Sequence, residues 1–552
     1  MFQSLELKNL NFETWDTNLK LLKDISLRIS TGERIGITGA SGSGKTTLCY
    51  HLAGVHRDAL TGKTSGEILV NGHPIHFEDT SDSGYLKAGM ILQNPESQLF
   101  ASTVADEIGY GLTNPGDEEI QKTLRILGLE DLGGHEIHTL SLGQKQRVVI
   151  AAFLTIHPDL LILDEPTNSL DSATSDRFLE YLSSIDCTQI MIEHDLERLA
   201  RWADRIIEMA DGRIVIDAPA ELWLEKTQIK PRGFQIALSI SEKYGFSCPP
   251  KDIGRLPDWA SQTEGALFEP EIRIENPPFS ELLLRFEQVD CGYKQGNQIL
   301  QDVTFSIHSG EVVALLGLNG SGKTTLLKHM AGLLKPQAGC ILWKDEALPY
   351  GKPELLFGRV GLVFQNPDYQ IFDSTVEREC EFCLRNHRIP QNESAHRVDK
   401  WLKRFDLDDL KDRSPLTLSY GEKRRLTLAS ILVAEPKLLL LDEPTTALDE
   451  SFIKYLRNLI HDLVKNHSLS ICIATHDADF ALDVADRIVL LSHGRVQADV
   501  PVSQLTVEHL EQIGLPVPLT SQIAIQSGII HQPVGYWNLK NQLKEYENEK
   551  TA

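Results

Sequence analysis

Two glycine-rich stretches carry the strongest chemical signal in this sequence. Each follows an apolar run, opens a helical pattern and matches G-x-x-x-x-G-K-[ST], which in that context predicts a phosphate-binding loop. The glycines let backbone N–H groups converge on phosphate oxygens at a helix N-terminus, the lysine adds positive charge, and the threonine hydroxyl after it suits Mg²⁺. The predicted phosphate contacts are Gly39, Ala40, Ser41, Gly42, Ser43, Gly44, Lys45, Thr46 and Thr47 in the first stretch, and Gly317, Leu318, Asn319, Gly320, Ser321, Gly322, Lys323, Thr324 and Thr325 in the second.

An acidic pair ends a later apolar run in each half of the chain. Asp164 and Glu165 follow LLIL, and Asp442 and Glu443 follow LLLL. In both halves the aspartate stands 119 positions after the loop lysine. We expect the aspartates to hold Mg²⁺ and the glutamates to polarise an attacking water. Adjacent acids are often only a solvated loop, but these end an apolar strand at a matched distance from a phosphate loop.

A histidine follows the next apolar run in both halves. His194 lies in MIEHD and His476 in IATHD. A single histidine would more often be structural. Because it recurs at the same place in two nucleotide-binding units, we expect each one to contact a terminal phosphate.

These matched spacings show that one unit is written twice. A chain of 552 residues is too long for a single hydrophobic core, and short apolar strands alternating with helices predict an α/β fold with a mainly parallel sheet in each unit. A mixed connector with a helix around 234–244 lies between the units. The predicted divisions are residues 1–224 (first unit), 225–280 (connector with a short helical extension), 281–510 (second unit) and 511–552 (helical tail).

Composition narrows the class of partner. The chain has 78 acidic and 54 basic residues and a net charge of -24. This charge disfavours nucleic acid and stable insertion into anionic lipid, so we expect protein partners. No apolar run is long enough for a membrane-spanning helix, no secretory signal is visible, and the eight cysteines show no disulfide spacing, which together favour a cytoplasmic location.

Two further repeated motifs complete a family pattern. LSLGQ (residues 140–144) and LSYGE (418–422) each precede a helix, and QNPESQLF (93–100) returns as QNPDYQIF (365–372). With the phosphate loops, acidic pairs and histidines, they make the chain resemble ATP-binding cassette (ABC) ATPases over nearly all of both units. The resemblance implies a phosphate-loop NTPase fold with a helical subdomain and an antiparallel β subdomain in each unit, and ATP and Mg²⁺ as ligands.

The resemblance also implies a head-to-tail sandwich. Each ATP would lie between the phosphate loop of one unit and the signature motif of the other, which is LSLGQ (140–144) or LSYGE (418–422). One site would combine Lys45, Thr46, Gln93, Asp164, Glu165 and His194 with Ser419 and Gly421. The other would combine Lys323, Thr324, Gln365, Asp442, Glu443 and His476 with Ser141 and Gly143. The glutamines would reach Mg²⁺ and the water.

The resemblance also implies contacts to the base. Trp15 and Tyr293 would stack on adenine, with a plain core aromatic as the alternative. The family's usual LSGGQ is altered at Leu142, Tyr420 and Glu422, which leaves open whether both sites turn over equally.

The form QNPxxQ[LI]F followed by TV resembles energy-coupling factor (ECF) transporters in particular. Such a resemblance implies ATP-driven uptake of a vitamin, vitamin precursor or metal ion. It implies a membrane-spanning T-type partner, a substrate-capture subunit and a peripheral position at the cytoplasmic face of the cell membrane. The alternative is a soluble tandem ABC ATPase acting on ribosomes or nucleic acid, which the acidic composition disfavours. A nucleotide-binding scaffold without turnover is opposed by the two intact glutamates.

Two local alternatives stay open in the sequence. Phe100 and Phe372 would either form the wall of a groove for a partner's cytoplasmic helix or pack inside the helical subdomain. Cys380 and Cys383, with His387 nearby, would be either a fragment of a metal site or packing residues, and the alignment of the two halves favours packing.

Overall fold

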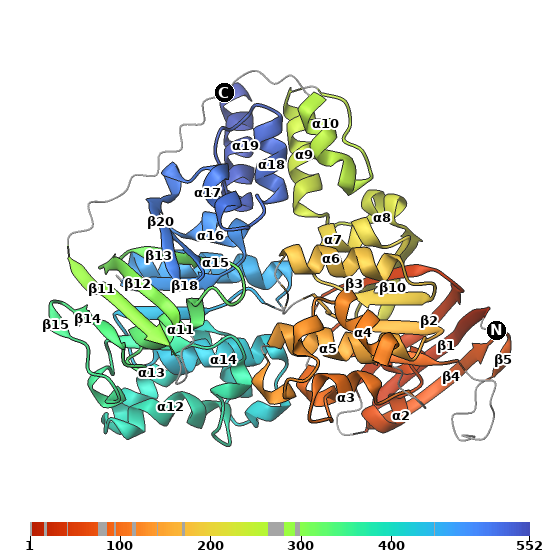
Figure 1. Cartoon of the computed structure of the whole chain (residues 1–552), viewed down its shortest axis with the longest axis horizontal. Coiled ribbons are helices and arrows are strands. Elements are labelled where there is room, and N and C mark those ends of the chain that lie inside the picture. The colour runs from red at the N-terminus through yellow and green to blue at the C-terminus, as the bar shows by residue number, and fades with distance from the viewer. Residues whose placement is uncertain are drawn as a thin grey trace. The chain divides into compact units, whose positions relative to one another are not determined.

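The computed structural model divides the chain into two compact units, shown in Figure 1. Unit 1 comprises residues 1–235 and 249–256, and unit 2 comprises 236–248 and 257–552. The described residues are 3–15, 19–40, 42–74, 86–92, 95–112, 117–140, 142–167, 170, 172–244, 246–262, 281–292, 298–446, 448–467 and 469–551. Part of the predicted connector, residues 263–280, lies outside them.

Unit 1 combines a six-stranded sheet, a four-stranded sheet and helices. In the larger sheet the order is β10-β9-β3-β8-β7-β6, with only the β9–β10 pair antiparallel. The smaller sheet is antiparallel, in the order β2-β1-β4-β5. The elements are β1 (Ser4–Thr14), β2 (Lys20–Ser30), β3 (Arg34–Thr38), α1 (Lys45–Leu52), α2 (His56–Ala59), β4 (Gly62–Val70), β5 (His73–Pro74), β6 (Ala88–Ile91), α3 (Val104–Gly109), α4 (Asp117–Ile126), α5 (Leu142–Thr155), β7 (Leu160–Asp164), α6 (Ser172–Ser183), β8 (Thr188–Ile192), α7 (Leu196–Trp202), β9 (Arg205–Ala210), β10 (Arg213–Pro219) and α8 (Ala220–Lys226).

Unit 2 repeats this architecture strand for strand. Its larger sheet has the order β16-β17-β18-β13-β19-β20, and its antiparallel sheet has the order β12-β11-β14-β15. The elements are β11 (Leu282–Gly292), β12 (Gln298–His308), β13 (Val312–Leu316), α11 (Lys323–Met330), β14 (Ala338–Trp343), β15 (Glu346–Ala347), β16 (Val360–Val363), α12 (Val376–Asn386), α13 (Gln391–Arg404), α14 (Tyr420–Leu432), β17 (Leu438–Asp442), α15 (Glu450–His467), β18 (Ser470–Thr475), α16 (Ala478–Val484), β19 (Arg487–Ser492) and β20 (Arg495–Pro501). The predicted fold class is confirmed in both units.

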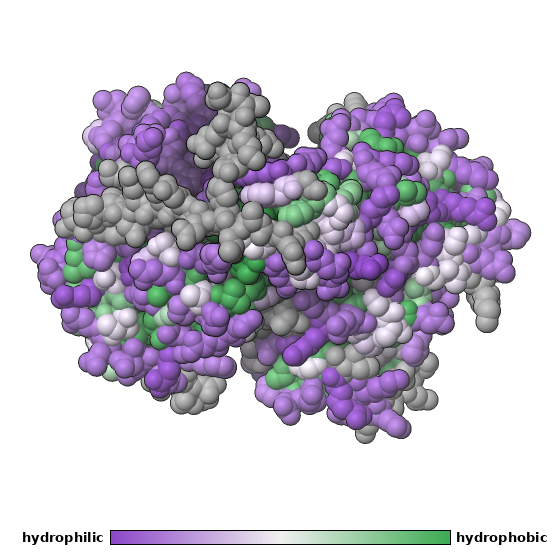
Figure 2. Space-filling model, turned by 90° about the horizontal axis from the view of Figure 1, so that it is seen from above, coloured by the Kyte–Doolittle hydropathy of each residue, from purple (hydrophilic) through white to green (hydrophobic). Residues whose placement is uncertain are grey.

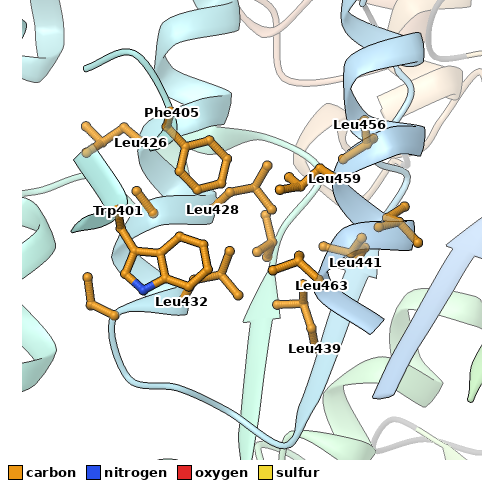
Figure 3. Close-up of a cluster of buried hydrophobic side chains, with 14 of the residues drawn as sticks. Trp401, Phe405, Leu426, Leu428, Leu432, Leu439, Leu441, Leu456, Leu459 and Leu463 are labelled. Carbon is orange, nitrogen blue, oxygen red and sulfur yellow. The ribbon is translucent and has the colours of Figure 1, made fainter. Parts of the chain in front are cut away.

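Apolar runs form the buried strands, as expected for a parallel sheet covered on both faces. Every residue of β7 and of β17 is buried. In unit 2 the helical subdomain consists of α12, α13 and α14. Figure 3 shows Leu428 and Leu432 of α14 between Trp401 and Phe405 on one side and Leu439 and Leu441 of β17 on the other. This packing holds α14, whose first turn belongs to the signature motif, against β17.

Helices also form the connector and the tail. The predicted helix at 234–244 is confirmed as α9 (Arg232–Tyr244), which is followed by α10 (Leu256–Gln262). The tail contains α17 (Val507–Gln512), α18 (Leu519–Gln526) and α19 (Tyr536–Thr551). Among the described residues, no helix is both long enough and apolar enough to cross a membrane. The face shown in Figure 2 is mostly hydrophilic, with small hydrophobic areas.

Candidate functional site

Strand registers bring the predicted residues of each unit to one edge of its larger sheet. In unit 2, Leu316 at the end of β13 lies opposite Thr475 of β18, and Asp442 at the end of β17 lies opposite Ala474. In unit 1, Ile192 of β8 lies opposite both Ile37 and Asp164. The phosphate loop, the acidic pair and the histidine therefore all leave the sheet at the carboxyl ends of neighbouring parallel strands, where ligands bind in open α/β sheets.

The phosphate loops have the backbone that their glycines predict. A Cβ on Gly39 would lie 2.2 Å from the Met209 carbonyl oxygen, and one on Gly317 would lie 2.2 Å from that of Leu491, so only glycine fits there. Gly44 and Gly322 cap α1 and α11 with φ of 97° and 104°, in the left-handed region that favours glycine. Glycine is therefore required at the start of each loop and at the cap of the helix that the loop opens.

Polar groups inside these loops fit an anionic ligand. The Oγ atoms of Ser43 and Ser321 are buried and have no hydrogen-bond partner among the described residues. The buried Lys45 ammonium donates to the carbonyls of Gly39 (2.8 Å) and Ala40 (2.9 Å), and Lys323 makes the matching bonds in unit 2. Buried hydroxyls without partners are rare in native structures, so these two suit the oxygens of a bound phosphate. Ser41 lies outside the described residues.

Two of the three predicted metal ligands, the threonine and the aspartate, meet in each unit. Thr46 Oγ1 donates to Asp164 at 2.9 Å, and Thr324 Oγ1 donates to Asp442 at 3.0 Å. Burial and the neighbouring glutamate raise the pKa of each aspartate to about 6. A buried carboxylate next to a second one is held in its charged form by a cation, so a hydroxyl and a carboxylate in this arrangement fit Mg²⁺.

Each predicted water-polarising glutamate pairs with the predicted histidine. Glu165 lies 2.7 Å from Nε2 of His194, and Glu443 lies 2.9 Å from Nδ1 of His476. Burial alone would raise the pKa of Glu443, but His476 and Lys323, whose ammonium is 3.3 Å away, lower it to about 2. Burial lowers the pKa of each histidine, but the hydrogen bond to the glutamate and its negative charge outweigh burial, so the pKa is raised.

Both glutamates also have strained backbones. Their φ angles are 53° for Glu165 and 42° for Glu443, in the left-handed region that non-glycine residues rarely adopt. Such outliers persist only where the surroundings impose them, and they concentrate at functional sites. The strain recurs at the same residue of both units, which favours a catalytic role for these two side chains.

The repeated segments 93–100 and 365–372, each called the Gln loop after its first glutamine, are held by residues that were not predicted from the sequence. The second glutamine of the motif, Gln98, accepts from Leu92 N (2.7 Å) and donates to Met90 O (2.8 Å), and Gln370 makes the same pair of bonds to β16 and Phe364. A buried glutamate of the next helix, Glu107 or Glu379, accepts two backbone N–H groups at the end of the loop. The signal was available, because all four residues repeat at matched positions.

Gln365 itself leaves β16 beside the acidic pair, since Val363 lies opposite Leu441. Its carbonyl accepts from Tyr420 Oη at 3.4 Å. Gln93, its counterpart in unit 1, lies outside the described residues.

The signature motif of unit 2 begins α14. Ser419 caps this helix in a reciprocal arrangement with Glu422: the serine Oγ accepts from Glu422 N, and the Glu422 carboxylate accepts from Ser419 N and from its hydroxyl, both at 2.7 Å. Gly421 faces open space, and a Cβ there would meet no atom within 4 Å. In unit 1, Gly143 lies in the first turn of α5, whereas Ser141 lies outside the described residues.

The remaining predicted positions are less informative. Trp15 follows β1 and is 68% exposed, and Tyr293 lies outside the described residues. Cys383 Sγ donates to the Ser430 carbonyl at 3.6 Å, and His387 stacks on Phe357 with ring centroids 3.8 Å apart. The described residues contain no group of three metal-ligating side chains, and these contacts agree with packing.

Comparison with known proteins identifies the family. The ABC transporter family model matches residues 22–168 and 300–446. A protein of Methanosarcina mazei, named as an ABC transporter ATP-binding protein, is 34% identical over 550 residues, covering 94% of this chain and 92% of its own. YkoD of Bacillus subtilis, named as an HMP/thiamine import ATP-binding protein, is 32% identical over 521 residues, covering 91% of this chain and 92% of its own.

One solved structure is also similar. It is described as cbiO1 from Clostridium perfringens, part of the ABC transporter complex cbiONQ, and is 36% identical with a TM-score of 0.39, covering 41% of this chain and 90% of that one. One family match falls within each of the two units that carry the phosphate loops and acidic pairs. The chain belongs to the ABC transporter family, as a tandem pair of ATP-binding ATPase domains.

Proposed function

We propose that this chain hydrolyses ATP at two sites to drive uptake of a small molecule through a separate membrane partner, as ECF transporters do. The supporting comparison is YkoD, which is named for HMP/thiamine import and is similar over 91% of this chain. The substrate class is a vitamin, vitamin precursor or metal ion. The partners are a membrane-spanning T-type subunit and a substrate-capture subunit, with the chain peripheral at the cytoplasmic face of the cell membrane.

Each site divides the work among its own residues. The threonine and aspartate that meet in the structure would hold Mg²⁺ together with the glutamine of the Gln loop, and the ion would neutralise phosphate charge. Because the pKa of Glu443 is lowered to about 2, its carboxylate is ionised at neutral pH and can accept a hydrogen bond from the attacking water. The histidine holds that carboxylate in place and would contact the terminal phosphate.

The two units would close on ATP within one chain, each signature completing the site of the other unit. A ligand shifts such an equilibrium only through contacts that differ between the two states, and the terminal phosphate of ATP supplies contacts that ADP lacks. Ser141→Arg and Ser419→Arg should therefore block closure while leaving nucleotide binding to a single unit intact. Distances between labels on the two units, measured with ATP and with ADP in a Glu165→Gln, Glu443→Gln background, test this. Equal distances would refute it.

The single observation that carries the transport proposal is a repeated, exposed aromatic pair beside each Gln loop. Phe100 and Tyr110 are 74% and 76% exposed, with ring centroids 6.4 Å apart. Phe372 and Phe382 occupy the matching positions of unit 2, and their centroids are 4.8 Å apart. Phe372 is 63% exposed. Exposed aromatic rings that recur at equivalent positions suit anchors for a helix docked in a groove, and they oppose the alternative that both phenylalanines pack inside the helical subdomain.

The ion pairs that hold the loops beside these aromatic rings also recur in both units. The short 3-10 helix of each loop is tied to the signature helix by an ion pair, Lys145–Glu96 (2.6 Å) in unit 1 and Lys423–Asp368 (2.7 Å) in unit 2. A partner helix seated on the loop would therefore press on the helix that begins with the signature. This contact offers a physical route between a membrane partner and the nucleotide.

The test changes the exposed middle of each loop without touching the glutamines. Ser97→Arg and Tyr369→Arg should each weaken retention of the membrane partner in detergent-solubilised membranes and stop uptake, while basal ATPase changes much less. Val215→Arg is the matched control, because this exposed apolar residue lies on β10, away from the loops. Retention and uptake at the unmodified level in both loop variants would remove the support for docking here. Recovery of ribosomal proteins in place of two integral membrane proteins would favour a tandem ATPase acting on ribosomes.

A further inference from the structure

A buried arginine follows the signature of unit 2. Arg424 on α14 is only 2% exposed. Its guanidinium donates to the carbonyl of Phe364, to that of Glu443 (2.9 Å) and, at 3.5 Å, to that of Asp442. One side chain thus holds the residue before Gln365 and both members of the acidic pair.

These carbonyls lie where two neighbouring strands of the larger sheet end. Asp442 ends β17, Glu443 has the strained φ of 42°, and Phe364 follows the last residue of β16. The amide N–H of Phe364 is already held by Gln370 at 2.8 Å, so Arg424 fixes the opposite side of the same residue. A planar guanidinium has five donors in a fixed geometry and can hold several acceptors at once.

The equivalent position of unit 1 has a different residue and different contacts. Six positions after the first leucine of the signature stands Gln146 in unit 1 and Arg424 in unit 2. Gln146 is fully buried, and its Nε2 donates to the Pro166 carbonyl at 2.6 Å. Its Oε1 has no partner among the described residues. The amide therefore reaches the residue after the acidic pair, whereas the guanidinium reaches the pair itself.

We propose that Arg424 is a positioning residue for hydrolysis in unit 2, which fixes the backbone of Glu443 and the start of the Gln loop as one rigid group. The proposal rests on the proposed roles of Glu443 and Gln365. Because Arg424 acts on main-chain carbonyls behind the site, its removal affects how precisely the carboxylate is aimed and leaves the phosphate loop unchanged. Small misplacements of reacting groups lower kcat, whereas loss of ground-state binding raises KM.

The test isolates one site at a time. In a Glu165→Gln background, where turnover comes from unit 2, Arg424→Gln should lower kcat about tenfold and change KM less than about twofold. Arg424→Lys keeps the positive charge but has no planar fork, so it should give an intermediate kcat. In a Glu443→Gln background, where turnover comes from unit 1, Arg424→Gln should leave kcat within about twofold of its parent. ATP binding by unit 2, measured with a fluorescent analogue in this background, should be unchanged.

Arg425→Gln is the matched control on the same helix. Arg425 donates to the Phe405 carbonyl at 2.9 Å, inside the helical subdomain, so this variant measures the general cost of losing an arginine from α14. Full kcat in Arg424→Gln, a rise in KM alone, or an equal loss in Arg425→Gln would overturn the proposal. Failure of both Arg424→Gln and Arg424→Lys to fold would also overturn it, because the role would then be structural.

Failure of the underlying site assignment would look different. If Glu443→Gln alone left turnover from unit 2 intact, the proposed role of Glu443 would be wrong, whatever Arg424 does. If turnover depends on Glu443 but not on Arg424, only the positioning role is overturned.

Discussion

The two units share the residues at the nucleotide edge of the sheet but differ in the residues that hold them. Both have the loop lysine, the Thr–Asp contact, the strained glutamate and its histidine partner. Unit 2 supports its acidic pair with Arg424, whereas unit 1 has Gln146 there. Unit 2 also has a carboxylate, Glu422, on its signature serine, where unit 1 has Gln144.

The residues around His194 and His476 differ between the units in the same way. In unit 1 the residue before the histidine is the buried Glu193, which accepts from the Thr167 hydroxyl, and Arg198 donates to that hydroxyl at 2.9 Å. In unit 2 the residue before the histidine is Thr475, whose hydroxyl accepts from Asp477 N at 3.0 Å. Among the described residues, the chemical groups are thus the same in both units while their supports differ, so we expect the two proposed sites to run at different rates.

The largest effect should come from the shared glutamates. Loss of a water-polarising group costs about 10²- to 10⁴-fold, so Glu165→Gln and Glu443→Gln should each silence one site, and the double variant should bind ATP without turnover. Steady-state ATPase of the two single variants then gives the rate of each site. Glu180→Gln, an exposed acid on α6, is the control. Unmodified turnover in either single variant would mean that its site is regulatory.

A second prediction concerns a support that the units share. Gln98→Ala and Gln370→Ala each remove two hydrogen bonds and leave a backbone donor unpaired, at a cost of about 1–3 kcal/mol. Because the distances match, both variants should lose similar hydrogen-exchange protection, in peptides covering residues 86–92 and 359–364 respectively. A loss confined to one unit would show that the two Gln loops are not equivalent.

The third prediction tests the carboxylate on the signature. Glu422→Gln removes a negative charge beside Ser419, where the proposed sandwich would place a phosphate, so it should lower the ATP concentration for half-maximal turnover by up to about fivefold. The measurement is made with Glu443→Gln, so that turnover comes from the site that would use this signature. Gln144→Glu, measured with Glu165→Gln, should raise the required ATP concentration. No change in Glu422→Gln would mean that residue 422 does not face the nucleotide, and no change in Gln144→Glu would mean the same for residue 144.

Sequence patterns predicted the fold because apolar runs and phosphate loops are both local features of the chain. Buried strands such as β7 and β17 are continuous apolar runs, and each phosphate loop is contiguous in the chain. The duplication then doubled every observation, so the acidic pairs and histidines could be placed by their spacing alone. Strand register, which brings these residues to one edge, follows from the parallel sheet that the apolar runs predict.

The supports of the site could not be predicted in the same way. Arg424 bonds to carbonyls 60 and 19 positions away, and main-chain acceptors leave no mark in the sequence. The spacing of Gln98 and Gln370 identified a repeated motif but not that the amide closes the loop onto its own strand. Exposure of Phe100 and Phe372 was also undetermined, because it depends on how the helical subdomain packs.

The smallest effect concerns the contact between α16 and the tail helix α19 in unit 2. The residue at the equivalent place in unit 1 cannot make this contact. Asp483 on α16 accepts the N–H groups of Trp537 (3.0 Å) and Asn538 (2.9 Å) at the start of α19. Arg201 stands at the equivalent place in α7, seven residues after its histidine. Burial and the nearby Asp479 raise the pKa of Asp483 to about 7.

This raised pKa gives a pH dependence of defined sign. The unfolded chain releases the Asp483 proton near pH 4, whereas the folded unit retains it up to about pH 7, so the stabilisation is complete below pH 4 and is lost as the pH rises through 7. Between pH 6 and 8, the free energy of unfolding of the unmodified chain should fall by about 1 kcal/mol more than that of Asp483→Asn, which cannot titrate. Urea unfolding followed by tryptophan fluorescence at both pH values measures the difference. Identical pH dependence in the two proteins would show that this carboxyl titrates at its ordinary value and that tail docking in unit 2 is independent of pH.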